Sequence, residues 1–526
     1  NFTVTKAAAN SKITMLTDNT GVDTTDEDKI NEALDALAGK LFYTGAIGGA
    51  ENNLNGTVKI AEGLTATSVA KQTAGIVYDK TTGQGSADHK TVTPGPVYPT
   101  EQDRTAFVTS ITGEHLTDKE YRKAGVLSNT VDNNIYNFTK DATTITTDSS
   151  AITTAKDTTL KLNNNDMTIT ANSGDGIATS SGKLTVQDAG SLTVSGAKAI
   201  NANNSKVEIT AVNATLNGDV STNNVVNIKA TKAAKVNGAV SANGANAAVT
   251  IDSADTTIGS DITANGNGAK VTVKNLSKLN GDVATDADGS VELNFKEGAS
   301  WTGDNSGNTT MSLSKGTWNG ANTGKLNATL TNGTSWTGDS SGAGSTIKLD
   351  ASSWSGMNSG ANANVTLTNG ASWNGANTGS NATVNLTDSS WTGDNSGAGL
   401  SLTANNSKWN GSTSAAGSAT LTNGSIWTGA STSADFSLTL NGSTWNNSGA
   451  SSLKSFNATN GIVDMTNAAA SVTIGSYSGD ATVIYKHNSS NPGEVYGGNF
   501  TVKSAKNGSK ITMLTDNTGV DTTDED

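Results

Sequence analysis

The segment 390–397, Ser-Trp-Thr-Gly-Asp-Asn-Ser-Gly, is one copy of a repeat in which each copy contains a single tryptophan. All nine tryptophans of the protein lie in this repeat, with successive spacings of 17, 18, 18, 19, 18, 18, 18 and 18 residues. They are Trp301, Trp318, Trp336, Trp354, Trp373, Trp391, Trp409, Trp427 and Trp445. A fixed period near 18 residues is typical of a solenoid in which each repeat forms one coil.

Each repeat also contains a short run of alternating apolar and polar residues, such as Val365-Thr366-Leu367. Asn-Gly and Ser-Gly pairs separate these runs and are typical of turns. Helix-pair repeats are longer than this period, and residues that favour helices are scarce. The pattern therefore predicts an all-β fold, a parallel β-helix in which equivalent residues of successive coils lie about 4.8 Å apart.

The nine tryptophans would then form one column roughly 40 Å long. An exposed column could stack on sugar rings, whereas a buried column would be part of the core. Burying one tryptophan and two or three aliphatic side chains contributes on the order of 10 kcal/mol per coil, about half of it from the tryptophan. Nine exposed indoles would also form a larger apolar patch than soluble monomers usually show. These energies favour a buried column, in which the nine tryptophans form a structural core ladder. The residues of the binding face then remain unknown.

The composition limits the possible partners. The net charge is −13 and the only arginines are Arg104 and Arg122, so a nucleic-acid partner is not expected. The tract from Trp301 to Trp445 has four lysines and six aspartates, which predicts a nearly neutral surface of hydroxyls and amides. There is no cysteine, which excludes disulfides and thiolate metal sites. No signal peptide opens the chain, so we expect an internal segment of a longer protein.

The two ends of the sequence repeat each other. Residues 1–28 recur at 499–526 with 23 of 28 positions identical, at an offset of 498 residues. Residues 29–526 are therefore expected to form one module, with 1–28 as the tail of a preceding module and further tandem modules in the same chain.

Five segments are predicted. They are the tail 1–28, a helix with an irregular protruding subdomain at 29–139, a β-helix with coils of about 20–23 residues at 140–300, the 18-residue tryptophan coils at 301–452 and a β junction at 453–526. Between the first two, Asp26 to Leu41 is expected to be an amphipathic helix that caps or bends the solenoid, because its leucines share one face. A second short helix is expected at 117–125, where Thr117 and Glu120 have the spacing of a capping box.

The last tryptophan coil, Leu438-Thr-Leu440-Asn-Gly-Ser-Thr-Trp445, is followed by bulkier strands that contain Gly461-Ile-Val463-Asp-Met465 and Val472-Thr-Ile474. In this arrangement the chain from 140 to 526 resembles the passenger of bacterial autotransporters, with 453–515 similar to the autochaperone junction. The resemblance implies a right-handed parallel β-helix carried across the outer membrane through a C-terminal barrel and displayed on the cell surface. In that family the junction occurs once, before the barrel. Here it stands at both ends with no barrel after it, so we expect a segment of a multi-module passenger, anchored through a region outside this sequence.

The sequence contains no motif typical of a catalytic or metal site. Asp304, Asp339 and Asp394 follow the same Trp-Thr-Gly motif, but they lie on coils that are not adjacent, about 10 to 15 Å apart, so turn capping is favoured over glycosidase chemistry. The histidines, at positions 89, 115 and 487, are not at metal-ligand spacings. No Gly-x-Ser-x-Gly motif stands between a strand and a helix. The sequence thus predicts no enzyme, no cofactor and no metal.

Two functions remain open. The first is a cell-surface adhesin whose stacked Asn, Ser and Thr side chains bind copies on neighbouring cells, or a host glycan or matrix protein. The second is a passive stalk that displays a distal tip. A β-helix polysaccharide-processing enzyme is the third alternative.

Overall fold

The structure, a computed structural model, describes residues 150–488 and 491–516, together with shorter strands before residue 150. The described residues contain no helix, and none therefore offers a helix long and apolar enough to cross a membrane. The helix expected at 117–125 lies outside the described residues, as do residues 26–40 of the helix expected at 26–41, whose last residue, Leu41, instead begins a strand. The early strands are β1 (Phe2–Val4), β2 (Leu41–Tyr43), β3 (Val58–Ala61), β4 (Val69–Ala70), β5 (Val77–Lys80), β6 (His89–Gly95), β7 (Leu127–Asn129), β8 (Asn134–Asn137) and β9 (Ala142–Thr147).

Two kinds of pairing occur among these early strands. β3, β6, β5 and β4 form a four-stranded antiparallel sheet in the segment where an irregular subdomain is expected. β7, β8 and β9 instead pair in parallel with β10, β11 and β12 of the solenoid that follows. Solenoid pairing therefore begins at Leu127.

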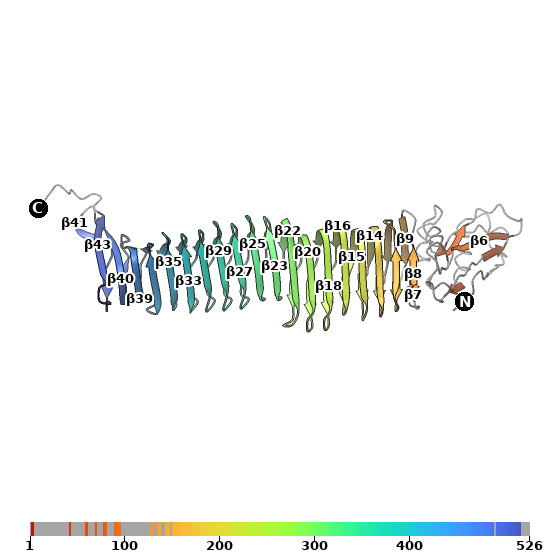
Figure 1. The fold of residues 1–526 in the computed structure, drawn as a ribbon, viewed down its shortest axis with the longest axis horizontal. Helices are drawn as coiled ribbons and strands as arrows, with labels where there is room; N and C mark the ends of the chain where they lie inside the picture. Colours follow the sequence, from red (N-terminus) through yellow and green to blue (C-terminus); the bar gives the residue numbers. More distant parts are fainter. Residues whose placement is uncertain are drawn as a thin grey trace. The chain divides into compact units, whose positions relative to one another are not determined.

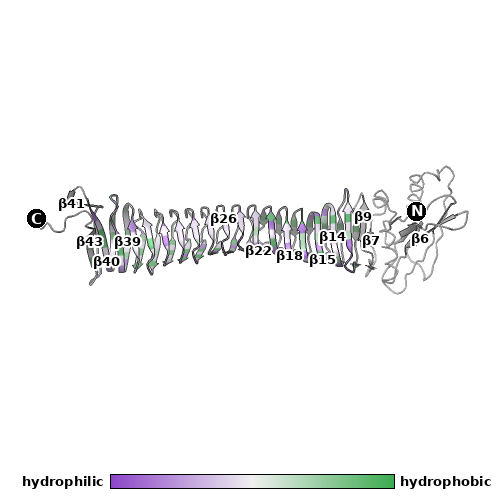
Figure 2. Ribbon diagram, turned by 90° about the horizontal axis from the view of Figure 1, so that it is seen from above, coloured by the Kyte–Doolittle hydropathy of each residue, from purple (hydrophilic) through white to green (hydrophobic). Residues whose placement is uncertain are grey.

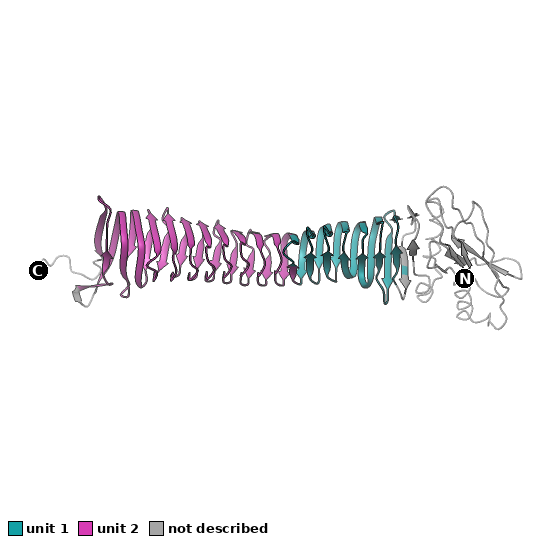
Figure 3. Ribbon diagram, turned by 90° about the horizontal axis from the view of Figure 1, so that it is seen from below, with its two compact units in different colours: residues 1–281, 285–292 teal, residues 282–284, 293–526 magenta. Residues whose placement is uncertain are grey.

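The chain divides into two compact units, residues 1–281 with 285–292, and residues 282–284 with 293–526 (Figure 3). In the first unit the solenoid strands are β10 (Ile152–Thr154), β11 (Thr158–Lys161), β12 (Asp166–Ala171), β13 (Ile177–Thr179), β14 (Lys183–Ala202), β15 (Lys206–Thr222), β16 (Val225–Val236), β17 (Val240–Asn243), β18 (Ala248–Ile258), β19 (Ile262–Asn265) and β20 (Lys270–Asn280). The boundary between the two units falls within β21 (Val283–Thr285) and β22 (Ser290–Thr302).

Parallel register stacks equivalent aliphatic residues in the first unit. Ile209 pairs with Ile228, Ile228 with Ile251, and Ile251 with Val273, and all four side chains are buried. Because side chains alternate along a strand, the residues between them face outward. Stacked aliphatic side chains thus form the core of this unit.

The second unit begins its regular coils at β22. Its strands are β23 (Thr309–Ser314), β24 (Thr317–Asn319), β25 (Leu326–Thr331), β26 (Ser335–Thr337), β27 (Thr346–Asp350), β28 (Ser353–Ser355), β29 (Asn364–Thr368), β30 (Ser372–Asn374), β31 (Thr383–Thr387), β32 (Ser390–Thr392), β33 (Leu400–Asn405), β34 (Lys408–Asn410), β35 (Gly417–Thr422), β36 (Ile426–Gly429), β37 (Phe436–Asn441), β38 (Thr444–Asn447), β39 (Ala450–Asp464), β40 (Ser471–Asn488), β41 (Asn491–Tyr496), β42 (Phe500–Val502) and β43 (Lys510–Asp516).

Each tryptophan coil has two strands, a longer one with leucines and a short one with the tryptophan. Both pair in parallel with their equivalents one coil away, as in Leu349 with Leu367 and Trp354 with Trp373 (Figure 1). Apolar and polar residues alternate along them (Figure 2). The prediction of an all-β parallel solenoid is confirmed.

Candidate binding face

The nine tryptophans lie inside the second unit, where they form one continuous stack. Each indole is 0–1 % exposed. Successive ring centroids are 4.4–5.1 Å apart, and the ring planes differ by only 3–8°. No aromatic strip is therefore available at the surface of these coils, and the residues beside each tryptophan become the candidates for binding.

Each indole N–H also has a fixed partner. From Trp318 to Trp445, Nε1 donates to the carbonyl of the glycine that follows the preceding tryptophan by two positions, at 2.8–3.1 Å. Those glycines pack closely on one another, since a Cβ added to Gly375 would lie 1.9 Å from the Gly356 carbonyl oxygen. The Trp-x-Gly spacing of the repeat thus has a steric cause.

A buried polar ladder follows at the corner of each coil. Its members are 0–1 % exposed and pair in parallel one coil apart; they are Asn305, Asn322, Ser340, Asn358, Asn377, Asn395, Thr413 and Ser431. The amide of Asn377 donates to Asn395 Oδ1 at 2.7 Å, and Asn358 donates to Asn377 Oδ1 at 2.6 Å. Oδ1 of Asn358 has no hydrogen-bond partner among the described residues, because the equivalent residue of the preceding coil is the shorter Ser340. These hydrogen bonds stabilise the corner of each coil and orient the residues on either side of it.

The residue after each tryptophan points outward. We name this set the amide–hydroxyl column: Thr302, Asn319, Thr337, Ser355, Asn374, Thr392, Asn410, Thr428 and Asn446. Its members are in register along the short strands, and the first seven are exposed. Asn446 donates to Thr428 Oγ1 at 3.2 Å. The other seven have no side-chain hydrogen bond within the part of the chain that is described. No member carries a charge, so the column is a row of unused neutral donors and acceptors at the coil spacing.

A second row lies beyond the buried polar ladder. We name it the hydroxyl column: Ser306, Thr323, Ser341, Ser359, Thr378, Ser396, Ser414 and Thr432. Every member is exposed and is a serine or threonine. Their backbone N–H groups donate to the preceding coil, as Ser396 does to Asn377 at 2.8 Å, which fixes their spacing. The two columns together are the candidate binding face.

The aspartates considered for catalysis lie between these columns. Asp304 accepts the backbone N–H of Ala321, Asp339 that of Met357, and Asp394 that of Ser412, each at 2.7 Å. Each carboxylate therefore connects its own turn to the turn of the coil that follows it. Among the described residues there is no group of three or more His, Asp or Glu side chains that could hold a metal ion.

The sequence indicated polar flanks but did not distinguish these rows. A signal was present, because every residue one position after a tryptophan is Thr, Asn or Ser, and the first eight residues five positions after one are Ser or Thr.

Comparison of the chain with protein-family models gives no match, and comparison with curated proteins gives none either.

Proposed function

We propose that this chain is a passenger segment of a bacterial cell-surface adhesin and that the amide–hydroxyl and hydroxyl columns are its binding face. The observation that carries the proposal is the amide–hydroxyl column, in which exposed neutral side chains without side-chain partners repeat in register over consecutive coils. A parallel β-solenoid is compatible with a passenger role. The resemblance of the sequence to autotransporter passengers supports the cell surface as the location of this chain.

A second copy of the same unit is the first partner to test. Two identical columns have the same period, so amides and hydroxyls of one copy meet acceptors and donors of the other along the whole row. Each such contact contributes about 1 kcal/mol or less. Summed over several coils, these contacts supply avidity without any single strong site. A host glycan or matrix protein rich in hydroxyls and amides uses the same chemistry.

The stalk is the second candidate, and the interior favours it. Indole stacking continues without interruption from Trp301 to Trp445, which is the packing expected of a stiff spacer. A stalk needs no binding face, so its outer residues can be exchanged freely while the number of coils is kept.

The experiment replaces neighbours in the amide–hydroxyl column by lysine, in the triple variant Thr337→Lys, Ser355→Lys and Asn374→Lys. Like charges across two facing columns repel, so self-association in sedimentation velocity and clumping of displaying cells are expected to fall at least tenfold. The matched control is Ser312→Lys, Thr329→Lys and Thr403→Lys, on the outward column of the longer strands, which already holds Lys348.

The outcomes separate the candidates. Loss with the first triple but not with the control supports a homotypic adhesin. A monomeric parent protein that binds a glycan or matrix protein, with binding lost in the first triple, supports the same face with a host partner. Association and binding that are equal in the parent and both triples overturn the adhesin and favour the stalk.

A further inference from the structure

The last coil of the second unit ends in an apolar surface that no other described residue covers. Val463 pairs with Val483 and Val483 pairs with Met513, so the three side chains occupy one column. Val463 and Val483 are fully buried, whereas Met513 is 61 % exposed. Exposure rises at Met513 because it is the last member of the column among the described residues.

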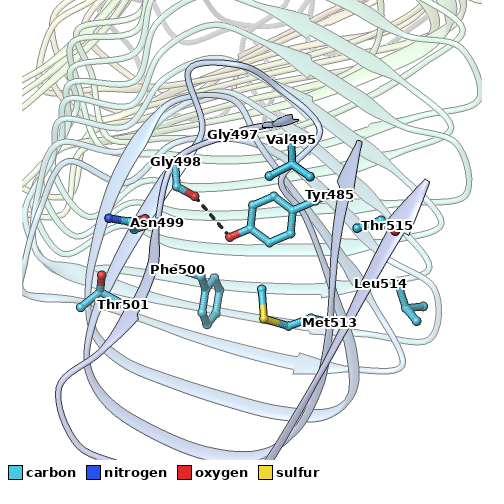
Figure 4. Close-up of a pocket in the computed structure, with 10 residues that line it drawn as sticks. All are labelled: Tyr485, Val495, Gly497, Gly498, Asn499, Phe500, Thr501, Met513, Leu514 and Thr515. Atoms are coloured by element: carbon cyan, nitrogen blue, oxygen red, sulfur yellow. Dashed lines mark hydrogen bonds between the residues drawn. The ribbon is translucent and has the colours of Figure 1, made fainter. Parts of the chain in front are cut away.

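The same surface is hollowed. A cavity of about 680 Å³ is lined by Tyr485, Phe500, Met513 and neighbouring residues. Figure 4 shows the rings of Tyr485 and Phe500 and the side chain of Met513 close together between the strands of the last coil. The Tyr485 hydroxyl donates to the Gly498 carbonyl at 3.2 Å, so its polar end is satisfied and its ring forms an apolar wall.

Two strand edges border this hollow. β42 and β43 pair in parallel with β40, and neither pairs with another described strand. The outer edge of each strand therefore presents unpaired backbone donors and acceptors beside exposed apolar side chains. Such an edge is a site for the addition of another strand.

The internal repeat shows which strand fits there. At the offset of 498 residues, β42 (Phe500–Val502) is the second copy of β1 (Phe2–Val4), and both have the sequence Phe-Thr-Val. β1 pairs in parallel with β2 (Leu41–Tyr43), with Phe2 opposite Leu41, Thr3 opposite Phe42 and Val4 opposite Tyr43. The first copy of this strand thus has a partner that the second copy lacks among the described residues.

We infer that the outer edge of β42 is a docking site for the Leu-Phe-Tyr strand of a following copy of this module. The register is that of β1 and β2, so Phe500 pairs with Leu41 of the following copy, Thr501 with Phe42 and Val502 with Tyr43. Side chains of parallel neighbours lie on the same face. The added strand therefore extends the sheet beside the half-buried Phe500 and Val502, at the edge of the hollow that Phe500 lines. Modules joined in this way share one pair of parallel strands at their junction, whatever their outer face binds.

The test is a tandem protein in which a second copy of residues 29–526 follows Asp526, in the order in which residue 29 follows Asp28. Cysteines are placed at Thr501 of the first copy and at Phe42 of the second, in a chain that has no cysteine of its own. Parallel neighbours lie within the Cα distance that a disulfide spans. After mild oxidation, peptide mass spectrometry is expected to find the Thr501→Cys and Phe42→Cys cross-link at least tenfold faster than the shifted pair Thr501→Cys and Thr44→Cys.

Two further variants make the result specific to the hollow. Met513→Asp places a charge inside it and is expected to reduce the rate of cross-linking at least tenfold, because a strand added at the edge of the hollow would remove that charge from water. Thr512→Asp is the matched control, since Thr512 precedes Met513, points to the other face of β43 and does not line the hollow, and it is expected to leave the rate unchanged. Equal rates for the matched and shifted pairs, or equal effects of the two aspartates, overturn the inference. A single copy of the chain with Thr3→Cys and Phe42→Cys tests whether β1 and β2 pair as the inference requires. If no cross-link forms in that variant, the inference is overturned as well. None of these results depends on whether the columns bind a partner.

Discussion

Trp354 and Trp373 stack with ring centroids 4.8 Å apart and ring planes 4° apart, although 19 residues rather than 18 separate them. The pairing shows where the additional residue lies. Thr368 pairs with Asp350 and Ser372 with Ser353, so three residues connect the strands in the later coil and two in the earlier one. A turn absorbs the change in length, and the indole stack is left intact.

Two turn types account for this tolerance. The three-residue turns carry Asn-Gly with positive φ at both residues, as at Asn369 (φ 56°) and Gly370 (φ 80°). The two-residue turns have one residue of positive φ, such as Asp388 (φ 50°) or Ala351 (φ 47°). Both connect equivalent strands of their coils, so the sequence can change turn type without shifting the register.

Ala351 should be a strained position. The left-handed backbone costs a residue with a Cβ about 1–2 kcal/mol, and glycine avoids this cost at an entropic loss of about 0.5–1 kcal/mol. Ala351→Gly is therefore expected to raise the free energy of unfolding by about 0.5–1 kcal/mol in urea titrations. Ala343→Gly, at an exposed alanine without positive φ, is the control and should lower it. Destabilisation by both variants would contradict the strain at Ala351.

The glycines of the Trp-x-Gly motif should tolerate no side chain. In Gly375→Ala the new Cβ would meet the Gly356 carbonyl, which also accepts the Trp373 indole N–H at 2.9 Å. Overpacking of this kind costs about 1–3 kcal/mol, and the lost hydrogen bond adds about 1 kcal/mol. Gly370→Ala is the matched control, because nothing lies within 4 Å of its added Cβ and only its positive φ is strained. Equal losses of unfolding free energy in the two variants would rule out the steric explanation.

The fold could be predicted because its main determinant is local. One tryptophan per coil and alternating apolar residues specify a parallel solenoid, and every coil repeats the same pattern, so no long-range pairing had to be guessed. The candidate face was harder to predict. Thr392 and Asn395 are both small polar residues of one turn, yet the first is exposed and the second is buried in the polar ladder. Their difference depends on the corner of the coil, which composition and period do not reveal.

The tryptophan fluorescence of the protein should come only from buried side chains. Since all nine tryptophans are 0–1 % exposed, tryptophan fluorescence is expected to be blue-shifted and much less sensitive to iodide than free tryptophan. Ready quenching of the native protein by iodide would contradict the buried stack. The unfolded protein in guanidinium is the control and should be quenched freely.

Removing one indole from the middle of the stack should be costly. Trp373→Ala leaves a cavity between Trp354 and Trp391 and is expected to lower the free energy of unfolding by about 3–5 kcal/mol. Trp373→Phe retains an aromatic ring but loses the N–H bond to Gly356, so its loss should be smaller. Urea titration followed by circular dichroism measures both, and an equal loss for the two variants would contradict a contribution from stacking.

Alkaline pH should weaken the C-terminal end of the second unit. Burial, with a further contribution from the Asp480 charge, raises the pKa of Tyr477 above its usual 10.0, and burial alone raises the pKa of Tyr485. The unfolded chain therefore loses these protons before the folded chain does. The stabilisation is fully present below about pH 10 and is lost as pH rises through the raised folded pKa, at up to about 1.4 kcal/mol per pH unit for each tyrosine.

Tyr477→Phe tests this pH dependence. It removes one titrating group together with the hydrogen bond from the Tyr477 hydroxyl to the Lys510 carbonyl, at 2.6 Å. The variant should therefore be less stable by about 1 kcal/mol at neutral pH and should lose less stability between pH 10 and 12. Ser476→Ala removes a neighbouring hydroxyl that does not ionise in this range, so it is the control and should keep the parent slope. A Tyr477→Phe variant with the full alkaline slope, measured by urea unfolding at each pH, would show that this buried hydroxyl is not the group whose ionisation opens the end of the solenoid.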